Sequence, residues 1–211
     1  MLGAAIAKGG ATVIRLGLRD DEATRELWPH SFALELEVAV GVALRVSLIA
    51  RNTGSAPFTC TGALHSYLAV GDVTLIAIHG LEGCAYVDKV DGGAEKVQRG
   101  PVTIVGETDR VYHDTVATCT IDDPVLGRRI AVAKRGSRST IIWNPWQEKA
   151  RRLADFDDEA YPSMVCVEAG YPRTDVTLND AVTIPPGGEH RLETTIGVER
   201  HVHHPEGTRS P

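Results

Sequence analysis

Two ionisable side chains have sequence surroundings that are unusual for their type. Glu168 lies in the run Met164 to Ala169, which is apolar on both alternating faces, and an isolated carboxylate is costly to bury in such a strand. Structural hydrogen bonding and service as a general base in a concave site are both compatible with that position. His65 lies in the run Pro57 to Val70, on the polar side that also carries Thr59, Thr61 and Tyr67. A histidine there can be an ordinary surface residue or an acid–base catalyst, and periodicity alone leaves both interpretations open.

Other clusters of potential ligands are interpreted as solvated. His201, His203 and His204 follow Glu199 and could bind a transition metal, but they lie in a tail that contains proline and glycine. The acidic loop from 155 to 159 lacks the glycine and the distant glutamate of an EF-hand calcium site. The four cysteines are far apart in the sequence, which indicates free thiols. We therefore predict no metal site.

Short strands must position the two candidate residues. Ser31 to Val40 alternates apolar residues with others, and Val42 to Arg51 resumes the pattern before a turn signal, which predicts a hairpin. Helical signals are confined to Asp20 to Leu27 and Gln147 to Leu153. Together these patterns predict an all-β fold, an antiparallel β-sandwich with few short helices. Further β-branched runs follow at Pro57 to Val70, Val73 to Ile78, Val102 to Val105, Arg110 to Ile121, Arg129 to Ala133, Thr140 to Trp143, Met164 to Ala169, Val182 to Ile184 and Arg191 to Val198.

Length and charge limit the possible partners. The chain has 211 residues, enough for a core of its own, and we assign residues 1–200 to one domain and 201–211 to a flexible polar tail. Its 22 basic and 28 acidic residues give a net charge of −6, so no nucleic acid or anionic membrane is an expected partner. No run approaches about 18 consecutive apolar residues, and the first positive charge, Lys8, follows the apolar opening. These features predict a cytoplasmic protein.

Several phrases of the sequence resemble one known family. Trp28-Pro29-His30 and Tyr86-Val87-Asp88-Lys89 agree with it, and the longer phrases are Phe58-Thr59-Cys60-Thr61-Gly62-Ala63-Leu64-His65-Ser66-Tyr67, Gly106-Glu107-Thr108-Asp109-Arg110-Val111-Tyr112, Trp143-Asn144-Pro145-Trp146 and Met164-Val165-Cys166-Val167-Glu168-Ala169-Gly170. In this order they resemble the hexose-6-phosphate mutarotases, or glucose-6-phosphate 1-epimerases, of the galactose-mutarotase-like superfamily. The resemblance implies that superfamily's large β-sandwich.

The resemblance also implies roles for three residues. His65 matches the family's catalytic histidine, Glu168 its catalytic glutamate, and Asp109 a carboxylate that holds sugar hydroxyls. Glu168 as base then removes the proton of the anomeric hydroxyl while His65 as acid protonates the ring oxygen. The implied reaction interconverts the α and β anomers of glucose 6-phosphate and related aldose 6-phosphates with no metal or organic cofactor. Trp143 and Trp146 could stack on a sugar, although Trp143 could instead cap the core.

Members of that family carry an N-terminal segment that has no counterpart in these 211 residues. It contains sandwich strands, arginines that grip the sugar phosphate and a His-Gly-Phe-Ala-Arg phrase. We therefore expect a monomer that tends to self-associate through uncovered apolar surface and has a weak preference for phosphorylated sugars. Two alternatives stay open, a noncatalytic carbohydrate-binding module and an aldose 1-epimerase that acts on unphosphorylated sugars.

Overall fold

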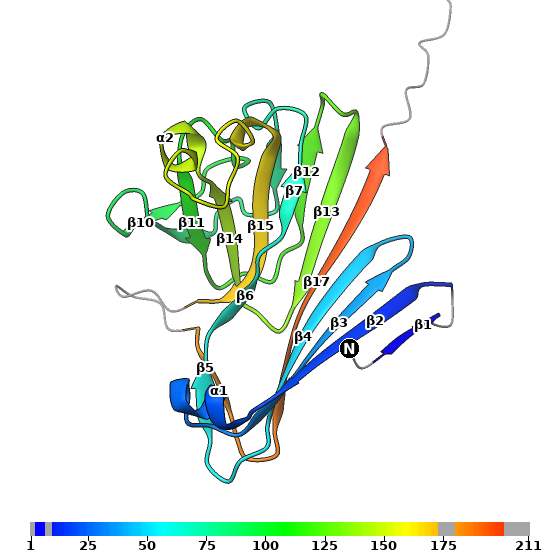
Figure 1. Cartoon of the computed structure of the whole chain (residues 1–211). Coiled ribbons are helices and arrows are strands. Elements are labelled where there is room, and N and C mark those ends of the chain that lie inside the picture. Colours follow the sequence, from blue (N-terminus) through cyan, green and yellow to red (C-terminus); the bar gives the residue numbers. More distant parts are fainter. Residues whose placement is uncertain (1–2, 7–9, 173–179, 201–211) are drawn as a thin grey trace, which may run out of the picture.

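The computed structural model describes residues 3–6, 10–172 and 180–200, and it is built mainly from antiparallel strands (Figure 1). The tail expected at 201–211 lies outside the described residues. One sheet has eight strands, in the order β1 (Gly3–Ile6), β2 (Thr12–Arg19), β3 (Phe32–Val40), β4 (Leu44–Asn52), β17 (Glu189–Arg200), β13 (Arg128–Arg135), β12 (Cys119–Asp123) and β8 (Ala77–His79). Below it is called the large sheet.

A second sheet carries most of the phrases that resemble the known family and is called the site sheet. Its order is β10 (Ala94–Val97), β9 (Ala85–Asp88), β11 (Thr108–Tyr112), β14 (Ser139–Asn144), β15 (Met164–Tyr171) and β6 (Gly62–Leu64), with β7 (Tyr67–Ala69) also paired to β15. A two-stranded sheet joins β16 (Val182–Ile184) to β5 (Phe58–Cys60). The expected antiparallel β-sandwich is therefore confirmed.

The main core lies between the site sheet and one end of the large sheet. Ile121 of β12 and Val132 of β13 pack there with Ile142 of β14 and Val165 of β15 in a single buried cluster. Burial of this apolar surface supplies the main stabilisation of the two layers. Figure 1 shows that β1 to β4 extend away from the site sheet at the other end of the large sheet.

Both helical segments expected from the sequence form, and they are short. Helix α1 (Glu22–Leu27) begins at Asp21, whose side chain accepts from the backbone N–H of Thr24 at 2.8 Å in a capping box. Helix α2 (Trp146–Ala150) is shorter than the predicted Gln147 to Leu153, and a single 3₁₀ turn, η1 (Tyr161–Ser163), precedes β15. No helix in the described ranges is long and apolar enough to cross a membrane.

Three of the predicted strand runs are wrong in their extent. Val73 to Ile78 contributes only the start of β8, because the Asp72 side chain accepts from the N–H of Thr74 at 2.8 Å and holds a turn. Val102 to Val105 is reduced to a single bridge between Val102 and Ile78. Arg110 to Ile121 divides into β11 and β12. Asp114 between them has a φ of 53°, which is incompatible with an extended strand.

The run from Pro57 to Val70 is also not one strand. It divides into β5, β6 and β7, because the chain leaves the two-stranded sheet at Thr61 to join β15 and is interrupted again at His65 and Ser66. His65 therefore lies in the gap between two short strands.

Candidate active site

His65 and Glu168 meet because the pairing with β15 keeps one register across that gap. Ala169 of β15 is opposite Leu64 of β6, and Cys166 is opposite Tyr67 of β7. Counting inward from both pairs places His65 opposite Glu168, and residues directly opposite in an antiparallel pair share a face of the sheet. The two side chains touch, with 3.3 Å between His65 Nε2 and Glu168 Oε1.

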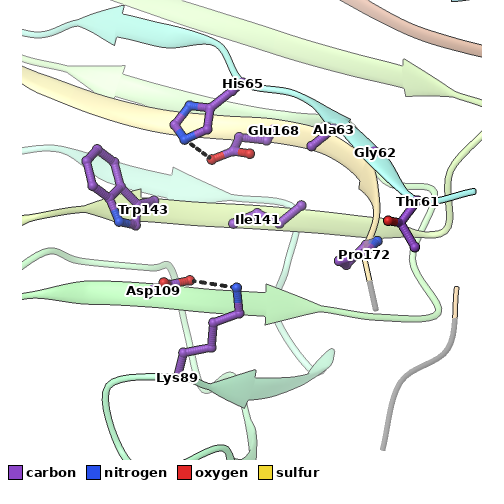
Figure 2. A pocket seen from close by; sticks show the side chains of 10 residues that line it. All are labelled: Thr61, Gly62, Ala63, His65, Lys89, Asp109, Ile141, Trp143, Glu168 and Pro172. Atoms are coloured by element: carbon purple, nitrogen blue, oxygen red, sulfur yellow. Dashed lines mark ion pairs between the residues drawn. The ribbon is translucent and has the colours of Figure 1, made fainter. Parts of the chain in front are cut away.

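The same counting brings Asp109 to this face. Cys166 of β15 is opposite Trp143 of β14, and Trp143 is in turn opposite Asp109 of β11. The backbone N–H of Lys89, just after β9, donates to the carbonyl of Asp109 at 2.9 Å and continues the row by one more strand. A row of side chains from separate strands thus crosses the sheet beside the His65–Glu168 pair, as Figure 2 shows for the labelled residues.

These side chains surround a cavity of about 380 Å³, within the range of small-molecule sites. All three residues singled out from the sequence line it. The lining consists of Thr61, Gly62, Ala63, His65, Lys89, Asp109, Ile141, Trp143, Glu168 and Pro172.

Lys89 is a cavity residue that the sequence reasoning did not assign. Its Nζ lies 3.6 Å from Asp109 Oδ1. The preceding residue, Asp88, points to the other side of the strand, where its carboxylate accepts from Val90 N–H at 3.1 Å and from Lys96 Nζ at 2.9 Å. Asp88 therefore locks the turn after β9 and fixes the position from which Lys89 enters the cavity. The signal available in the sequence was strand alternation. Continued past Val87, it places Lys89 on the same side of the strand as Val87.

Burial makes Glu168 an unusual carboxyl. Only 6% of its side chain is exposed, and burial raises its pKa to about 7, with the negative charge of Asp109 adding to the rise and Lys89 opposing it. A carboxyl with such a pKa holds its proton about as tightly as an ordinary imidazole, whose pKa is ~6.5. Glu168 can therefore exchange a proton with a substrate near neutral pH.

Aromatic side chains orient His65. Its ring stacks on Tyr67 with 4.8 Å between centroids, and the edge of Trp143 approaches at 5.7 Å. Partial burial lowers the pKa of His65, with a weaker opposing influence from the charge of Asp109. Burial therefore disfavours the charged form of each group, because it lowers the pKa of His65 and raises that of Glu168.

Cys166 is the remaining reactive group beside the pair. The ligand atoms of His65, Cys166 and Glu168 lie within 4.8 Å of one another, a spacing that a metal ion could also bridge. Burial raises the pKa of the Cys166 thiol well above its usual range, so the thiolate that a metal needs is costly here. The chemistry of this donor set therefore disfavours a metal ion at the cluster.

The two tryptophans of the Trp-Asn-Pro-Trp phrase have different surroundings. Trp143 is half-buried and lines the cavity, whereas Trp146 packs against the main core and next to Tyr161. Asn144 between them is fully buried and structural, because its amide donates to the carbonyls of Tyr161 at 2.8 Å and Met164 at 2.9 Å. This side chain ties the end of β14 to the start of β15.

Fold and site together define a class of protein, an antiparallel β-sandwich with a histidine–glutamate pair facing a small-molecule cavity. The chain belongs to the aldose 1-epimerase family, whose model matches residues 6–197. The family resemblance noted in the sequence is thereby confirmed.

Two curated relatives have names that state an activity. The chain is 33% identical over 183 residues to a protein of Cenchrus ciliaris provisionally named glucose-6-phosphate 1-epimerase, covering 84% of this chain and 54% of the relative. A protein of Salmonella typhimurium with the same provisional name is 37% identical over 155 residues, covering 73% of this chain and 51% of the relative. The chain thus spans about half the length of these curated relatives.

Solved structures agree with the fold. A Salmonella typhimurium protein provisionally described as a mutarotase has a TM-score of 0.81 and 32% identity, over 90% of this chain and 61% of that one. The Slr1438 protein of Synechocystis has a TM-score of 0.75 at 16% identity, over 94% of this chain and 65% of that one, which supports the fold alone.

Proposed function

We propose that this chain interconverts the α and β anomers of an aldose, with glucose 6-phosphate and related aldose 6-phosphates as substrates. The observation that carries the proposal is the 3.3 Å contact between His65 Nε2 and Glu168 Oε1 on the wall of the cavity. Family membership and the names of the relatives support the same reaction. The free thiols of all four cysteines are typical of a cytoplasmic protein, where we propose that it acts.

The reaction needs one base and one acid, and no net change in protonation. The reaction starts from the form of the pair that carries its proton on His65. Glu168 as carboxylate removes the proton of the anomeric hydroxyl, and His65 as imidazolium gives a proton to the ring oxygen as the bond between C1 and that oxygen breaks. After rotation about C1–C2, the ring oxygen returns its proton to His65 while Glu168 gives its proton back to the oxygen on C1. The pair ends in its starting state, so neither a metal nor a cofactor is required.

Two further cavity residues hold the sugar in this proposal. Asp109, with 17% of its side chain exposed, accepts hydrogen bonds from sugar hydroxyls on the wall opposite His65. Trp143 offers an apolar surface between them, of the kind on which sugar rings stack. The open sugar chain stays in place while it rotates because these contacts do not involve C1.

The test is anomeric exchange of glucose 6-phosphate followed by magnetisation-transfer NMR. Glu168→Gln and His65→Asn should each slow the enzyme-catalysed exchange about 10²-fold or more, because each removes a proton-transfer group. Asp109→Asn should act chiefly on KM, by about 1.5 to 3 kcal/mol, as expected for a hydrogen bond to a charged group.

His79→Asn is the matched control for His65→Asn. Its side chain is 43% exposed, against 47% for His65, but it pairs with Glu82 and Asp122 at the edge of the large sheet and should leave exchange unchanged. Undiminished exchange in Glu168→Gln would contradict the proposal. Sugar binding without exchange in the wild type would favour a carbohydrate-binding module, and faster exchange of glucose than of its phosphate would favour an epimerase of free sugars.

A further inference from the structure

The four lysines that the structure describes are held in different ways. Lys96 contacts two carboxylates at 2.9 and 2.7 Å, Lys134 donates to a backbone carbonyl at 2.8 Å, and Lys149 contacts one carboxylate at 3.0 Å. Lys89 has a single, longer contact of 3.6 Å with Asp109. Its ammonium group is therefore the loosest of the four.

Lys89 is also the lysine that lines the cavity. Its side chain is 46% exposed, and its ammonium group, with three donors, points toward Asp109 across the cavity (Figure 2). The turn locked by Asp88 and the backbone contact with Asp109 fix its Cα, while the long side chain stays free to turn from one acceptor to another. This combination is suited to an incoming anion.

Strand order sets the distance between this cation and the proton-transfer pair. β9, which ends next to Lys89, is three strand spacings from β15, which carries Glu168, so the two backbones are about 14 Å apart. Both side chains lean into the same cavity from opposite sides. A sugar with its anomeric carbon at Glu168 would direct its far end toward Lys89.

The carboxylates of the cavity oppose an anionic substrate, and Lys89 offsets this opposition. Glu168 and Asp109 both line the cavity, and a phosphate group would add about −1.5 to −2 charges to it. Repulsion from these carboxylates would disfavour that phosphate unless a cation lay beside it. Among the described lining residues, Lys89 is the one that carries a permanent positive charge.

We propose that Lys89 forms an anion subsite, in which its ammonium group turns from Asp109 to the phosphate of the substrate and so selects phosphorylated over free sugars. This inference rests on the proposed function and assigns the substrate selectivity of that site to one residue. A single half-exposed ammonium supplies a limited preference, so we expect glucose 6-phosphate to exceed glucose in kcat/KM by about three- to tenfold. Raising the salt concentration should reduce this ratio.

The experiment compares this ratio among four proteins: the wild type, Lys89→Met, Lys89→Arg and Lys149→Met. Lys89→Met should bring the ratio to about one, Lys89→Arg should retain it, and Lys149→Met is the control because Lys149 pairs with Glu107 outside the cavity lining. Loss of Lys89 also alters the charge near Asp109 and Glu168, but that effect acts on both sugars and cancels in the ratio. Equal losses for the two sugars, with the ratio unchanged, would overturn the proposal.

Calorimetric titration separates this proposal from the reaction itself. If the wild type accelerates exchange of neither sugar, the proposed function fails, while the subsite is still decided by equilibrium binding of glucose 6-phosphate and glucose. Tighter binding of the phosphate by the wild type and equal binding by Lys89→Met would support the subsite. Binding of the two sugars with equal affinity by the wild type, or binding of neither, would overturn it.

Discussion

Strands β3 and β15 differ in sequence pattern and in surroundings, because β3 alternates apolar residues with others whereas β15 is apolar on both faces. β15 is buried along its whole length, on both faces. β3 is buried at Phe32, but at its other end Val40 is 51% exposed, although both residues belong to the alternating apolar set of this half-buried strand. The predicted β3–β4 hairpin forms, and the far half of its apolar face lacks cover.

One row across the large sheet shows where the cover ends. Val132 of β13 is opposite Ile196 of β17, Ile196 is opposite Leu44 of β4, and Leu44 is opposite Val40 of β3. Val132 is 4% exposed and lies in the main core, whereas Val40 is half exposed. The site sheet packs against the end of the large sheet that carries β12 and β13 (Figure 1). Alternation therefore identifies which side chains share a face, and the second layer decides which of them are buried.

Two low-exposure carboxylates sharpen this contrast between the arm, defined as β2 to β4, and the site sheet. Glu37 of β3 accepts from Arg15 at 2.7 Å and from Arg45 at 3.4 Å, so its charge is compensated. In the part of the chain that the structure describes, Glu168 of β15 forms one ion pair, with His65, and its ionised form is opposed by burial and by Asp109. In the arm, the Glu37 carboxylate joins neighbouring strands through ion pairs. In the site sheet, burial of the Glu168 carboxylate lowers the stability of the fold.

The largest expected effect concerns stability. Neutralising Glu168 should raise the free energy of unfolding, whereas neutralising Glu37 should lower it. The unfolded chain releases the Glu168 proton near pH 4.5 and the folded chain near 7, so the folded protein binds more protons between these values and its free energy of unfolding falls as pH rises. Above pH 7, Glu168→Gln should therefore raise the free energy of unfolding by about 3 kcal/mol. Glu37→Gln should lower it by about 1 kcal/mol, because it weakens two ion pairs.

Urea unfolding at pH 8 and at pH 5 measures both changes. The gain in Glu168→Gln should shrink strongly at pH 5, where the wild-type carboxyl is protonated in the folded state. A loss of stability in Glu168→Gln at pH 8 would show that ionised Glu168 is well compensated, and the contrast with Glu37 would then be invalid.

A smaller effect is expected from adding one methyl group to the floor of the cavity. A Cβ at Gly170 of β15 would lie 2.8 Å from Ile141 Cδ1 and 3.1 Å from Ala63 Cβ, both in the cavity lining. Gly170→Ala should therefore cost about 1 to 2 kcal/mol of stability through overpacking and should raise KM. Gly197→Ala on β17 is the control, because a Cβ there has no neighbour within 4 Å among the described residues. Thermal unfolding and exchange kinetics of both variants test whether the cavity floor is as tightly packed as the complete burial of β15 indicates.

Local signals in the sequence predict much of this fold, but they predict its long-range strand pairings less well. The short helix predicted within Asp20 to Leu27 and the alternation of the β3–β4 hairpin depend on residues close in sequence, and both form as expected. The run containing His65 was predicted as one strand because alternation does not reveal that its parts pair with two different sheets. Lys89 was missed because it enters the site only through the pairing of β9 with β11.

The roles of His65, Glu168 and Asp109 are inferred from the family resemblance. Their position around one cavity is seen in the structure. Composition and periodicity left His65 and Glu168 each with two interpretations, since nothing local shows that they face one another. Register along β15 brings them into contact, and burial by the surrounding strands gives Glu168 its raised pKa. Both properties depend on residues distant in sequence, which is why pattern alone could not supply them.

The smallest expected effect on stability concerns the open face of the arm. Ile14, Leu16 and Leu18 of β2 are 37%, 43% and 50% exposed, and Leu16 is opposite Leu36 of β3 on the apolar face of the arm. Such a surface favours association between copies, which a charge at its centre should oppose. Leu16→Glu should therefore reduce self-association measured by sedimentation velocity, while the free energy of unfolding changes by less than about 0.5 kcal/mol.

Val42→Glu is the matched control, because Val42 lies in the exposed turn between β3 and β4 and adds the same charge away from the apolar surface. It should leave the association unchanged, and neither variant should alter anomeric exchange, since the arm contributes no residue to the cavity lining. Equal reduction by both variants would mean that net charge alone governs association. Loss of exchange in Leu16→Glu would show that the arm and the site sheet are energetically coupled, because the large sheet transmits disturbance from its uncovered end to β15.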